Sequence, residues 1–251
     1  MTGRLYLVPN TLDFGTGDAP DLQEVMPLGV IRIAARLTHW VAESAKTTRA
    51  FLKRVDAVVP LAQPLQAIQI TELPRPQKGA KSAPLAPVDR LLAPALQDHD
   101  VGLISEAGMP AVADPGAALV QAAHGQGIPV VALSGPSSLL LALAASGLNG
   151  QSFAFVGYLP VEAAERAVRI RELEGLSRRA AQTQLIIETP YRNEALLAAL
   201  LAALHPQTRL SVSCGLTLPA GWTRTDAVAG WRQRRASLPN DVPAVFALLA
   251  A

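Results

Sequence analysis

Short apolar runs rich in β-branched residues alternate along the chain with longer Ala- and Leu-rich runs of helical spacing. The first expected strand covers residues 5–8, and the first expected helix lies near residues 29–38. Further strands are expected at residues 101–105, 130–133, 153–156, 185–187, 210–213 and 244–249, and further helices near residues 117–124, 137–145, 162–177 and 194–204. This βαβ alternation predicts an α/β protein with mostly parallel sheets covered by helices on both faces.

The chain of 251 residues is long enough for two α/β lobes, since domains commonly contain roughly 100–200 residues. Gly108-Met109-Pro110 and Asp114-Pro115-Gly116 punctuate the chain directly after an expected buried strand. We therefore place a boundary near Pro110, between an N-terminal lobe of residues 1–110 and a C-terminal lobe of residues 111–251. Within the first lobe, residues 71–87 contain several Pro, Lys and Ala without periodicity, which predicts a mobile surface loop.

Composition narrows the class of protein. Half of the residues are hydrophobic and 17% are charged, which predicts a sizeable core rather than disorder. The single cysteine, Cys214, has no partner for an internal disulfide, and no histidine lies near it in sequence, so we expect no metal site. The formal charge of +2 is spread along the chain, which permits an RNA partner without indicating one.

The apolar segments do not predict a membrane protein. The first apolar run is too short for a signal peptide and meets Pro9 at once. The longest apolar stretch, residues 130–148, is interrupted by Ser134-Gly135-Pro136-Ser137-Ser138, and a bilayer requires roughly 20 unbroken apolar residues. We expect a soluble, cytoplasmic protein.

Three expected strand ends carry small or polar residues, in the position where open α/β sheets bind ligands. The strand at residues 101–105 runs into a small-residue turn, which is also typical of an ordinary tight connection. The strand at residues 130–133 precedes Ser137 and Ser138, either of which can cap the next helix while its free N–H groups face a polar ligand. Glu188 and Arg192 follow the third strand, where a structural ion pair is the alternative.

Together these stretches resemble the tetrapyrrole methylase superfamily and, within it, a divergent and short form of the small-subunit ribosomal RNA ribose methyltransferase I branch. The first stretch, from Ser105-Glu106-Ala107-Gly108-Met109-Pro110 to Asp114-Pro115-Gly116, resembles Ser-Asp-Ala-Gly-Thr-Pro to Asp-Pro-Gly. The second stretch, Gly135-Pro136-Ser137-Ser138, resembles Gly-Pro-Ser-Ala, and the third, Glu188-Thr189-Pro190-Tyr191-Arg192, resembles Glu-Ser-Pro-His-Arg. A further stretch, Phe155-Val156-Gly157-Tyr158-Leu159-Pro160, resembles Phe-Leu-Gly-Phe-Leu-Pro. Order and spacing agree over most of the chain.

The resemblance implies a two-lobed tetrapyrrole methylase fold, with mostly parallel or mixed sheets flanked by helices and the active site in the inter-lobe cleft. It implies that S-adenosyl-L-methionine is bound there in a bent shape, mainly through backbone groups, and that the protein is a homodimer. The donor-binding positions carried over are Pro9, Ser105, Glu106, Ala107, Gly108, Val112, Ser134, Gly135, Pro136, Ser137, Ser138, Glu188 and Thr189.

The amino-terminal part departs from the branch. Of the branch's Thr-Pro-Ile-Gly-Asn, only Pro9 is present. Farther on, Glu43 and Thr48 match the branch, whereas Lys46 replaces an Arg. Lys offers a point charge where Arg offers a planar fork for phosphate, so contacts with RNA are expected to differ at this position.

Methyl transfer from a sulfonium is an in-line displacement, so the protein chiefly aligns the nucleophile and excludes water. If the acceptor is a ribose hydroxyl, a group must help remove its proton, and Glu43, Glu106 and Glu188 are the acids near the expected cleft. We predict that Glu43 is the base or orients the substrate; a solvated helix glutamate is the alternative. The expected substrate contacts are Lys46, Arg49, Tyr191 and Arg192.

The expected function is therefore S-adenosylmethionine-dependent methyl transfer to a ribose 2'-hydroxyl of ribosomal RNA in the small subunit. The alternatives are a tetrapyrrole or another small-molecule acceptor, and a non-catalytic protein that binds S-adenosylmethionine. A group of aromatic and basic residues near the carboxyl terminus predicts either an RNA-stacking surface or a packed layer with a solvated basic edge. This group contains Trp222, Arg224, Trp231, Arg232, Arg234 and Arg235.

Overall fold

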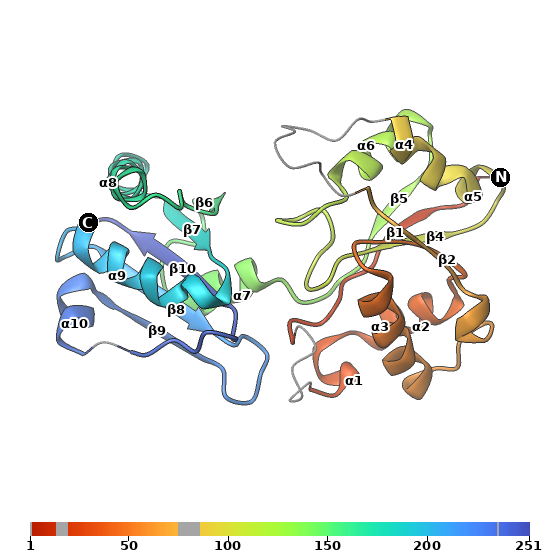
Figure 1. Ribbon diagram of the computed structural model, residues 1–251, viewed down its shortest axis with the longest axis horizontal. Helices are drawn as coiled ribbons and strands as arrows, with labels where there is room; N and C mark the ends of the chain where they lie inside the picture. Colours follow the sequence, from red (N-terminus) through yellow and green to blue (C-terminus); the bar gives the residue numbers. More distant parts are fainter. Residues whose placement is uncertain (1, 14–19, 75–85, 235) are drawn as a thin grey trace. The chain divides into compact units, whose positions relative to one another are not determined.

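The structure is a computed structural model that describes residues 2–13, 20–74, 86–234 and 236–251 (Figure 1). The chain divides into unit 1, Met1–Pro136, and unit 2, Ser137–Ala251. This division falls later than the expected boundary near Pro110, because strand β5 (Val130–Ala132) pairs with β1 (Leu5–Leu7) and so belongs to the first sheet. Residues 75–85 of the expected loop lie outside the described residues, whereas its start belongs to strand β3 (Gln69–Glu72).

Unit 1 is built on a parallel five-stranded sheet with the order β3-β2-β4-β1-β5, in which β2 is His39–Ala42 and β4 is Val101–Ile104. All four strand pairs are parallel, as the sequence predicted. The carboxyl ends of parallel strands meet at one edge of a sheet. The segments that follow β1, β2, β4 and β5 therefore share that edge.

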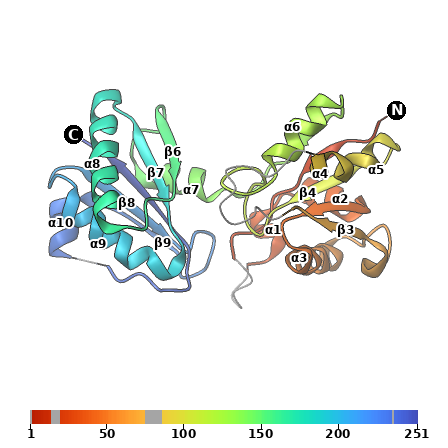
Figure 2. The ribbon, with the colours of Figure 1, turned by 45° about the horizontal axis from the view of Figure 1, so that its top comes forward.

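Helices cover both faces of the unit 1 sheet (Figures 1 and 2). One face is packed by α1 (Leu22–Val25), α2 (Leu28–Arg36) and α3 (Ala45–Val58). The other face is packed by α4 (Ala86–Asp89), α5 (Ala93–Leu96) and α6 (Ala117–Gly125). Short 3-10 turns lie at Leu65–Ala67 and Arg90–Leu92. Two apolar cores, one on each face, therefore hold the strands in place.

The start of α3 and the centre of the sheet each depend on particular residues. Ser44 is the N-cap of α3, and its hydroxyl accepts a hydrogen bond from the N–H of Thr47 at 3.4 Å. Gly102 in β4 faces the buried Trp40, and a Cβ at this glycine would lie 2.7 Å from Cε3 of the indole. Only glycine leaves room for Trp40 against the sheet.

Unit 2 contains a mixed five-stranded sheet with the order β6-β7-β10-β8-β9. Its strands are β6 (Phe153–Gly157), β7 (Thr183–Ile187), β8 (Arg209–Cys214), β9 (Trp222–Ala227) and β10 (Ala244–Leu249). Within this sheet β6 and β7 are parallel, and the other three pairs are antiparallel. The mixed sheet that the predicted fold allowed is therefore present. Its parallel part is limited to β6 and β7, because β10 inserts between β7 and β8 against the direction of both.

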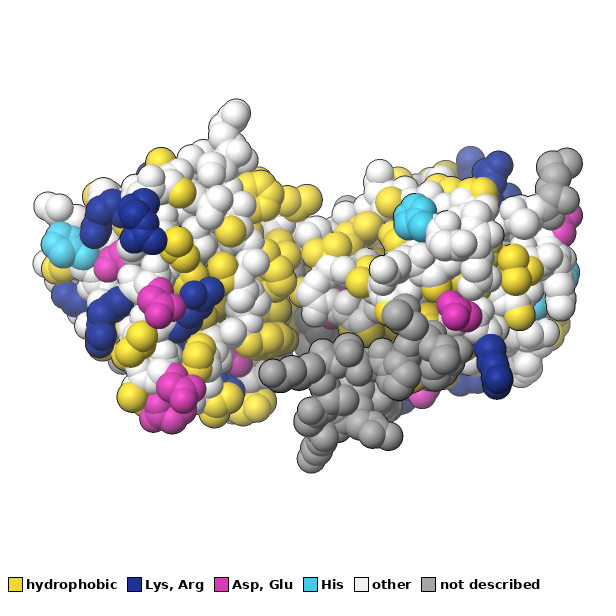
Figure 3. Space-filling view, turned by 90° about the horizontal axis from the view of Figure 1, so that it is seen from above, with side chains coloured by type: hydrophobic (Ala, Val, Ile, Leu, Met, Phe, Trp, Pro, Cys, Tyr) yellow, Lys and Arg dark blue, Asp and Glu magenta, His cyan; other side chains and the backbone are white. Residues whose placement is uncertain are grey.

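One face of the unit 2 sheet is covered by α8 (Ala163–Ala180), α9 (Asn193–Ala203) and α10 (Val228–Gln233), and the other by α7 (Ser138–Ser146). A 3-10 turn, Pro190–Arg192, leads into α9. Figure 3 shows hydrophobic side chains gathered on the side of unit 2 away from most of its visible Lys and Arg side chains. In the parts of the chain that the structure describes, no helix has the length and apolar character needed to cross a membrane.

Candidate active site

The carboxyl edge of the unit 1 sheet brings predicted donor-binding residues from three loops together. A Cβ added to Gly135, after β5, would lie 2.2 Å from Cγ of Pro9, after β1, so these loops are in direct contact. A Cβ added to Gly108, after β4, would lie 3.8 Å from the carbonyl oxygen of Pro136. Gly108 has φ +67°, a conformation that glycine adopts without strain. Pro9, Gly108 and Gly135 are therefore neighbours, although they are far apart in sequence.

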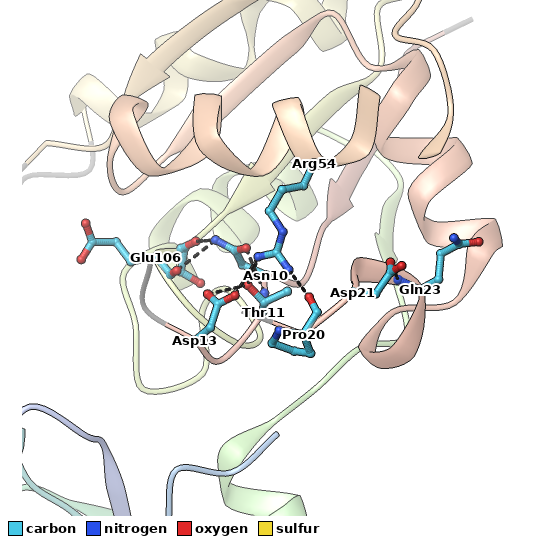
Figure 4. Close-up of polar contacts among 9 residues, drawn as sticks. Asn10, Thr11, Asp13, Pro20, Asp21, Gln23, Arg54 and Glu106 are labelled. Carbon is cyan, nitrogen blue, oxygen red and sulfur yellow. Dashed lines mark hydrogen bonds and ion pairs between the residues drawn. The ribbon is translucent and has the colours of Figure 1, made fainter. Parts of the chain in front are cut away.

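Asn10 joins the loop after β1 to the loop after β4. It forms an isolated β-bridge with Gly108, with N–O distances of 2.9 and 3.1 Å. Its side-chain amide donates to the carbonyl oxygens of Ser105 at 3.1 Å and Glu106 at 2.9 Å, and its Oδ1 accepts from the N–H of Thr11 at 2.9 Å (Figure 4). Asn10 is 5% exposed, so these bonds are shielded from water. The side chain of Asn10 therefore fixes the path of residues 105–108.

An ion pair anchors the same amino-terminal loop to α3. Arg54 Nη1 lies 2.7 Å from Asp13 Oδ2 and donates to the Thr11 hydroxyl at 3.1 Å, while Nη2 donates to the carbonyl oxygen of Pro20 at 2.8 Å (Figure 4). The Asp13 side chain is 6% exposed. Sequence analysis missed this pair and Asn10, since the interacting residues have no local pattern that marks them.

Glu43, the predicted base, lies directly after β2 at the same edge. Its Oε2 accepts a hydrogen bond from the N–H of Glu106 at 3.0 Å, and its own N–H donates to the carbonyl oxygen of Ile104 at 3.1 Å. The predicted substrate residues Lys46 and Arg49 are exposed on α3. Glu43 therefore supports the loop after β4, in addition to any role toward a ligand.

Asp114 lies close enough to Glu43 and Glu106 to feel their charge, although the sequence gave it no predicted role. Burial, the charge of Glu43 and the charge of Glu106 raise its pKa to about 6, while the nearby Ser105 hydroxyl opposes the shift. The predicted donor residue Val112 lies in the same connection and is 47% exposed. The sequence signal that was available is the Asp-Pro-Gly turn at residues 114–116.

The predicted donor residues of unit 2 lie at two element ends. Ser137 is the N-cap of α7, but neither it nor Ser138, the first helical residue, makes the side-chain capping bond that was expected. The carbonyl oxygen of Ser137 accepts the first hydrogen bond of the helix, from the N–H of Leu141 at 3.0 Å. The free N–H groups at the start of α7 are therefore not occupied by a serine hydroxyl and remain able to donate to a ligand.

Glu188, at the end of β7, is held on both of its carboxylate oxygens. Oε2 lies 2.9 Å from Nη2 of Arg192, and Oε1 accepts from the N–H and the hydroxyl of Thr189 at 2.8 and 3.2 Å. The structural ion pair between Glu188 and Arg192 is therefore present, and the Glu188 side chain in it is 2% exposed. Tyr191, by contrast, is 71% exposed.

The aromatic and basic group near the carboxyl terminus forms a packed layer. Trp231 is fully buried, and its indole N–H donates to the carbonyl oxygen of Leu210 at 2.8 Å. The guanidinium of Arg224 lies 4.1 Å from the centre of the Trp231 ring and pairs with Asp226, while Arg232 donates to two carbonyl oxygens near the end of α9. An RNA-stacking role for Trp231 is therefore wrong; Arg235 lies outside the described residues. Among residues 2–13, 20–74, 86–234 and 236–251, no group of three or more His, Cys, Asp or Glu residues is arranged to hold a metal ion.

Relatives named ribosomal RNA small subunit methyltransferase I are similar to part of the chain. The Mesorhizobium japonicum protein is 38% identical over 128 residues, which are 51% of this chain and 42% of that protein. The Pseudomonas aeruginosa protein is 42% identical over 94 residues, 38% of this chain and 32% of that protein. The Streptococcus pyogenes protein is 29% identical over 201 residues, 80% of this chain and 61% of that protein. The chain thus spans less than two thirds of the length of these relatives.

Solved methyltransferase structures share the fold. The uroporphyrin-III-C-methyltransferase from Thermus thermophilus has a TM-score of 0.54 and 22% identity, and the match covers 99% of this chain and 93% of that one. The methyltransferase CobJ has a TM-score of 0.56 and 17% identity, with coverage of 100% and 95%. Another structure of the Thermus enzyme, with a TM-score of 0.52, is complexed with S-adenyl homocysteine.

A family model matches most of the chain. The family described as Tetrapyrrole (Corrin/Porphyrin) Methylases matches residues 26–222 of the 251. These residues include β2 and β4 of unit 1 and most of the strands of unit 2. The resemblance seen in the strand-end motifs is thereby confirmed, and the chain belongs to the tetrapyrrole methylase family.

Proposed function

We propose that this chain is an S-adenosyl-L-methionine-dependent methyltransferase whose acceptor is a ribose 2'-hydroxyl of small-subunit ribosomal RNA. The observation that carries this proposal is the construction of the carboxyl edge of unit 1, where Asn10 holds residues 105–108 and Pro9 meets Gly135. Residues 105–108 and Gly135 belong to stretches whose sequence resembles the ribose methyltransferase branch, and Pro9 is the one position of the amino-terminal loop that matches it. The names of the curated relatives support small-subunit ribosomal RNA as the substrate.

The residues at this edge suit a polar, positively charged ligand such as the donor. Gly135 lets its loop pack directly against Pro9, and Gly108 has a left-handed conformation, so both loops bring main-chain groups to this edge, where open α/β sheets bind ligands. Glu43, Glu106 and Asp114 supply negative charge beside them. When bound, the donor supplies a methyl group on a sulfonium. We propose that it is held by Pro9, Ser105, Glu106, Ala107, Gly108, Val112, Ser134, Gly135, Pro136, Ser137, Ser138, Glu188 and Thr189.

We further propose that four residues outside the donor-binding set contact the acceptor. Lys46 and Arg49 stand one turn apart on α3 and offer positive charge to phosphates. Tyr191 offers an exposed ring on which a base can stack. Arg192 is also a candidate, although its guanidinium is engaged with Glu188. Glu43 remains a candidate to assist the acceptor or to orient the substrate.

The test is transfer of a labelled methyl group from S-adenosylmethionine to small ribosomal subunits that lack the native modification. Free RNA and a tetrapyrrole precursor are run in parallel. We expect label in RNA, and we expect the labelled position to resist alkaline cleavage, because a methylated 2'-oxygen cannot attack the adjacent phosphate. Label that leaves the phosphodiester sensitive to alkali would place the methyl group on a base and refute the ribose assignment.

A tetrapyrrole acceptor is the second candidate, because the structures that share the fold include a uroporphyrin-III-C-methyltransferase. Label in the tetrapyrrole alone would establish it. Donor binding without transfer in any arm would favour the non-catalytic alternative, which the departures at residues 8–12 support. A cytoplasmic location, which was expected from the apolar segments, is part of this proposal. So is a homodimer, which the resemblance implies and which sedimentation equilibrium tests.

A further inference from the structure

We propose that Asp114 accepts the proton of the acceptor hydroxyl, and that Glu43 is a positioning residue that fixes the loop of residues 105–108. This inference rests on the proposed function and assigns roles within the same site. It departs from the sequence-based prediction that Glu43 is the base. The contacts of the acidic residues at the site distinguish between the two.

The other acids are occupied or directed elsewhere. Glu43 Oε2 accepts the N–H of Glu106 at 3.0 Å, so this carboxylate holds the loop backbone. The Glu106 side chain is exposed and, in Figure 4, points away from Asn10. Both carboxylate oxygens of Glu188 are engaged by Arg192 and Thr189. Asp114, by contrast, forms no ion pair with any described residue.

A second observation at Asp114 points to a ligand. The Ser105 side chain lies close enough to lower the pKa of Asp114, yet its hydroxyl oxygen is buried and makes no well-formed hydrogen bond with a described residue. Ser105 as a whole is 3% exposed. A buried hydroxyl that lacks a well-formed hydrogen bond lowers stability by up to roughly 1–3 kcal/mol, so such groups are rare in the absence of a ligand. A ligand oxygen between Ser105 and Asp114 would satisfy both.

The backbone around Asp114 is held in an unusual conformation. Ala111 and Ala113 both have φ +65°, in the left-handed region that residues with a Cβ rarely adopt. Gly116 has φ +129°, and a Cβ there would lie 2.9 Å from Cδ2 of Leu103 in β4. The turn is therefore packed against the sheet, which fixes the position of Asp114. Strain of this kind concentrates where a side chain must be held in place.

Burial and neighbouring charges raise the pKa of Asp114 enough for its carboxylate to act as a base near neutral pH. Burial is the largest cause that raises its pKa to about 6. The groups that face it are Glu43 and Glu106, whose charges also raise the pKa, and the Ser105 hydroxyl, which lowers it. An acid with this pKa is deprotonated at pH 7–8 and is a stronger base than an ordinary carboxylate. An arrangement in which neighbouring acids raise the pKa of one of them is typical of catalytic groups.

The step balances without another reactant. The acceptor oxygen forms a bond to the methyl carbon while the bond from that carbon to sulfur breaks, and the sulfonium becomes a neutral thioether. The proton of the acceptor hydroxyl moves to the Asp114 carboxylate as the oxygen attacks. Asp114 then releases it to water, which restores the anion.

The test compares Asp114→Asn with a matched variant, Asp98→Asn, in the turn before the amino end of β4. Asp98 is exposed and has φ +66°, which asparagine tolerates. We expect Asp114→Asn to lower single-turnover transfer about 100-fold or more, the usual range for loss of a general base, and to retain affinity for S-adenosylhomocysteine. The wild-type rate should fall below pH about 6, and this acid limb should be absent in Asp114→Asn. Asp98→Asn should match the wild type.

Glu43→Gln separates the base from the positioning residue. It removes a neighbouring negative charge, so the acid limb of the pH–rate profile should move to lower pH but remain. If Glu43 itself were the base, its replacement would abolish this limb. Carbon-13 NMR of labelled Asp carboxyls adds a readout that does not need turnover: one carboxyl should titrate near pH 6, be absent in Asp114→Asn and shift when S-adenosylhomocysteine is added. Unchanged transfer by Asp114→Asn would overturn the inference and leave the proposed function standing. No transfer by the wild type to any acceptor would remove both.

Discussion

The contact between Pro9 and Gly135 gives a quantitative test of the site. In Gly135→Ala, the added Cβ would lie 2.2 Å from Cγ and 2.3 Å from Cβ of the Pro9 ring, far inside normal contact distance. Gly135 is not among the glycines with positive φ, so the alanine backbone is unstrained and the overlap alone determines the effect. Overpacking of a filled site costs roughly 1–3 kcal/mol, and we expect unfolding free energy to fall by about that amount.

The overlap should also weaken donor binding, because the two loops are not equally free to move. Pro9 is held on both sides, by the hydrogen bond from Val8 N to the carbonyl oxygen of Leu103 at 2.8 Å and by the bridge between Asn10 and Gly108. The turn at residues 134–136 must therefore shift. This turn is proposed to bind the donor, so the affinity for S-adenosylhomocysteine should fall in isothermal titration calorimetry.

Gly29→Ala is the matched control. A Cβ at Gly29, in α2, would meet nothing within 4 Å, so the same change should raise unfolding free energy by up to about 1 kcal/mol through the lower entropy of the unfolded chain. Urea unfolding followed by circular dichroism should therefore separate the unfolding free energies of the two variants by roughly 1–4 kcal/mol. A Gly135→Ala variant with the stability and donor affinity of the wild type would refute the close approach of these loops.

Three further changes test the remaining features of unit 1. Asn10→Ala leaves two loop carbonyls without an N–H donor, so unfolding free energy should fall by about 1–3 kcal/mol in urea titrations, and Asn10→Asp, which lacks the amide donors, should not restore it. Arg54→Met should cost about 2–3 kcal/mol because it removes the guanidinium that pairs with the buried Asp13 carboxylate, and the loss should be smaller when Asp13→Asn is added, in a double-mutant cycle. Asp114 has a pKa raised to about 6, so the folded state keeps its proton to higher pH than the unfolded state and stability falls as pH rises from about 4 to 6. Asp114→Asn should remove this pH dependence and raise the unfolding free energy at pH 7 by roughly 1 kcal/mol, allowing for solvent screening. Equal stability–pH profiles of the wild type and Asp114→Asn would contradict the raised pKa.

The sequence predicted those elements whose side chains are uniform in character. Strand β4 and helix α9, for example, lie within a residue of their expected bounds, because one is a buried apolar run and the other a long Ala- and Leu-rich run. Strand β3 was missed and was expected to begin a loop, because it is a polar edge strand. Helix α3 was missed because its exposed face is rich in Lys, Arg and Thr, which weakens the apolar period.

The candidate site was predictable as far as local motifs reach. The loops after β4 and β5 were identified from their glycines and prolines, whereas the loop after β1 entered through Pro9, which the family resemblance implied. Parallel strands bring such loops to one edge. The contacts that fix the loops join residues far apart in the chain: Asn10 with Glu106, and Arg54 with Asp13. Neither polar pair has a spacing that reveals it, and a hydrogen-bond partner is known only once the strand order is known. The antiparallel insertion of β10 was hidden for the same reason.

The loop network and the Asp114 turn have opposite energetic roles. Ala111 and Ala113 in left-handed conformations, an unsatisfied Ser105 hydroxyl and the crowding of acids at Asp114 all make the folded state less stable. The Asn10 bonds and the Arg54 ion pair stabilise the loops next to them. Natural proteins keep destabilising features where activity requires them and compensate nearby. Because the destabilising features converge on one carboxylate, a variant that is more stable and less active is the expected result of neutralising Asp114. A purely structural role would give the reverse correlation, with stability and activity falling together.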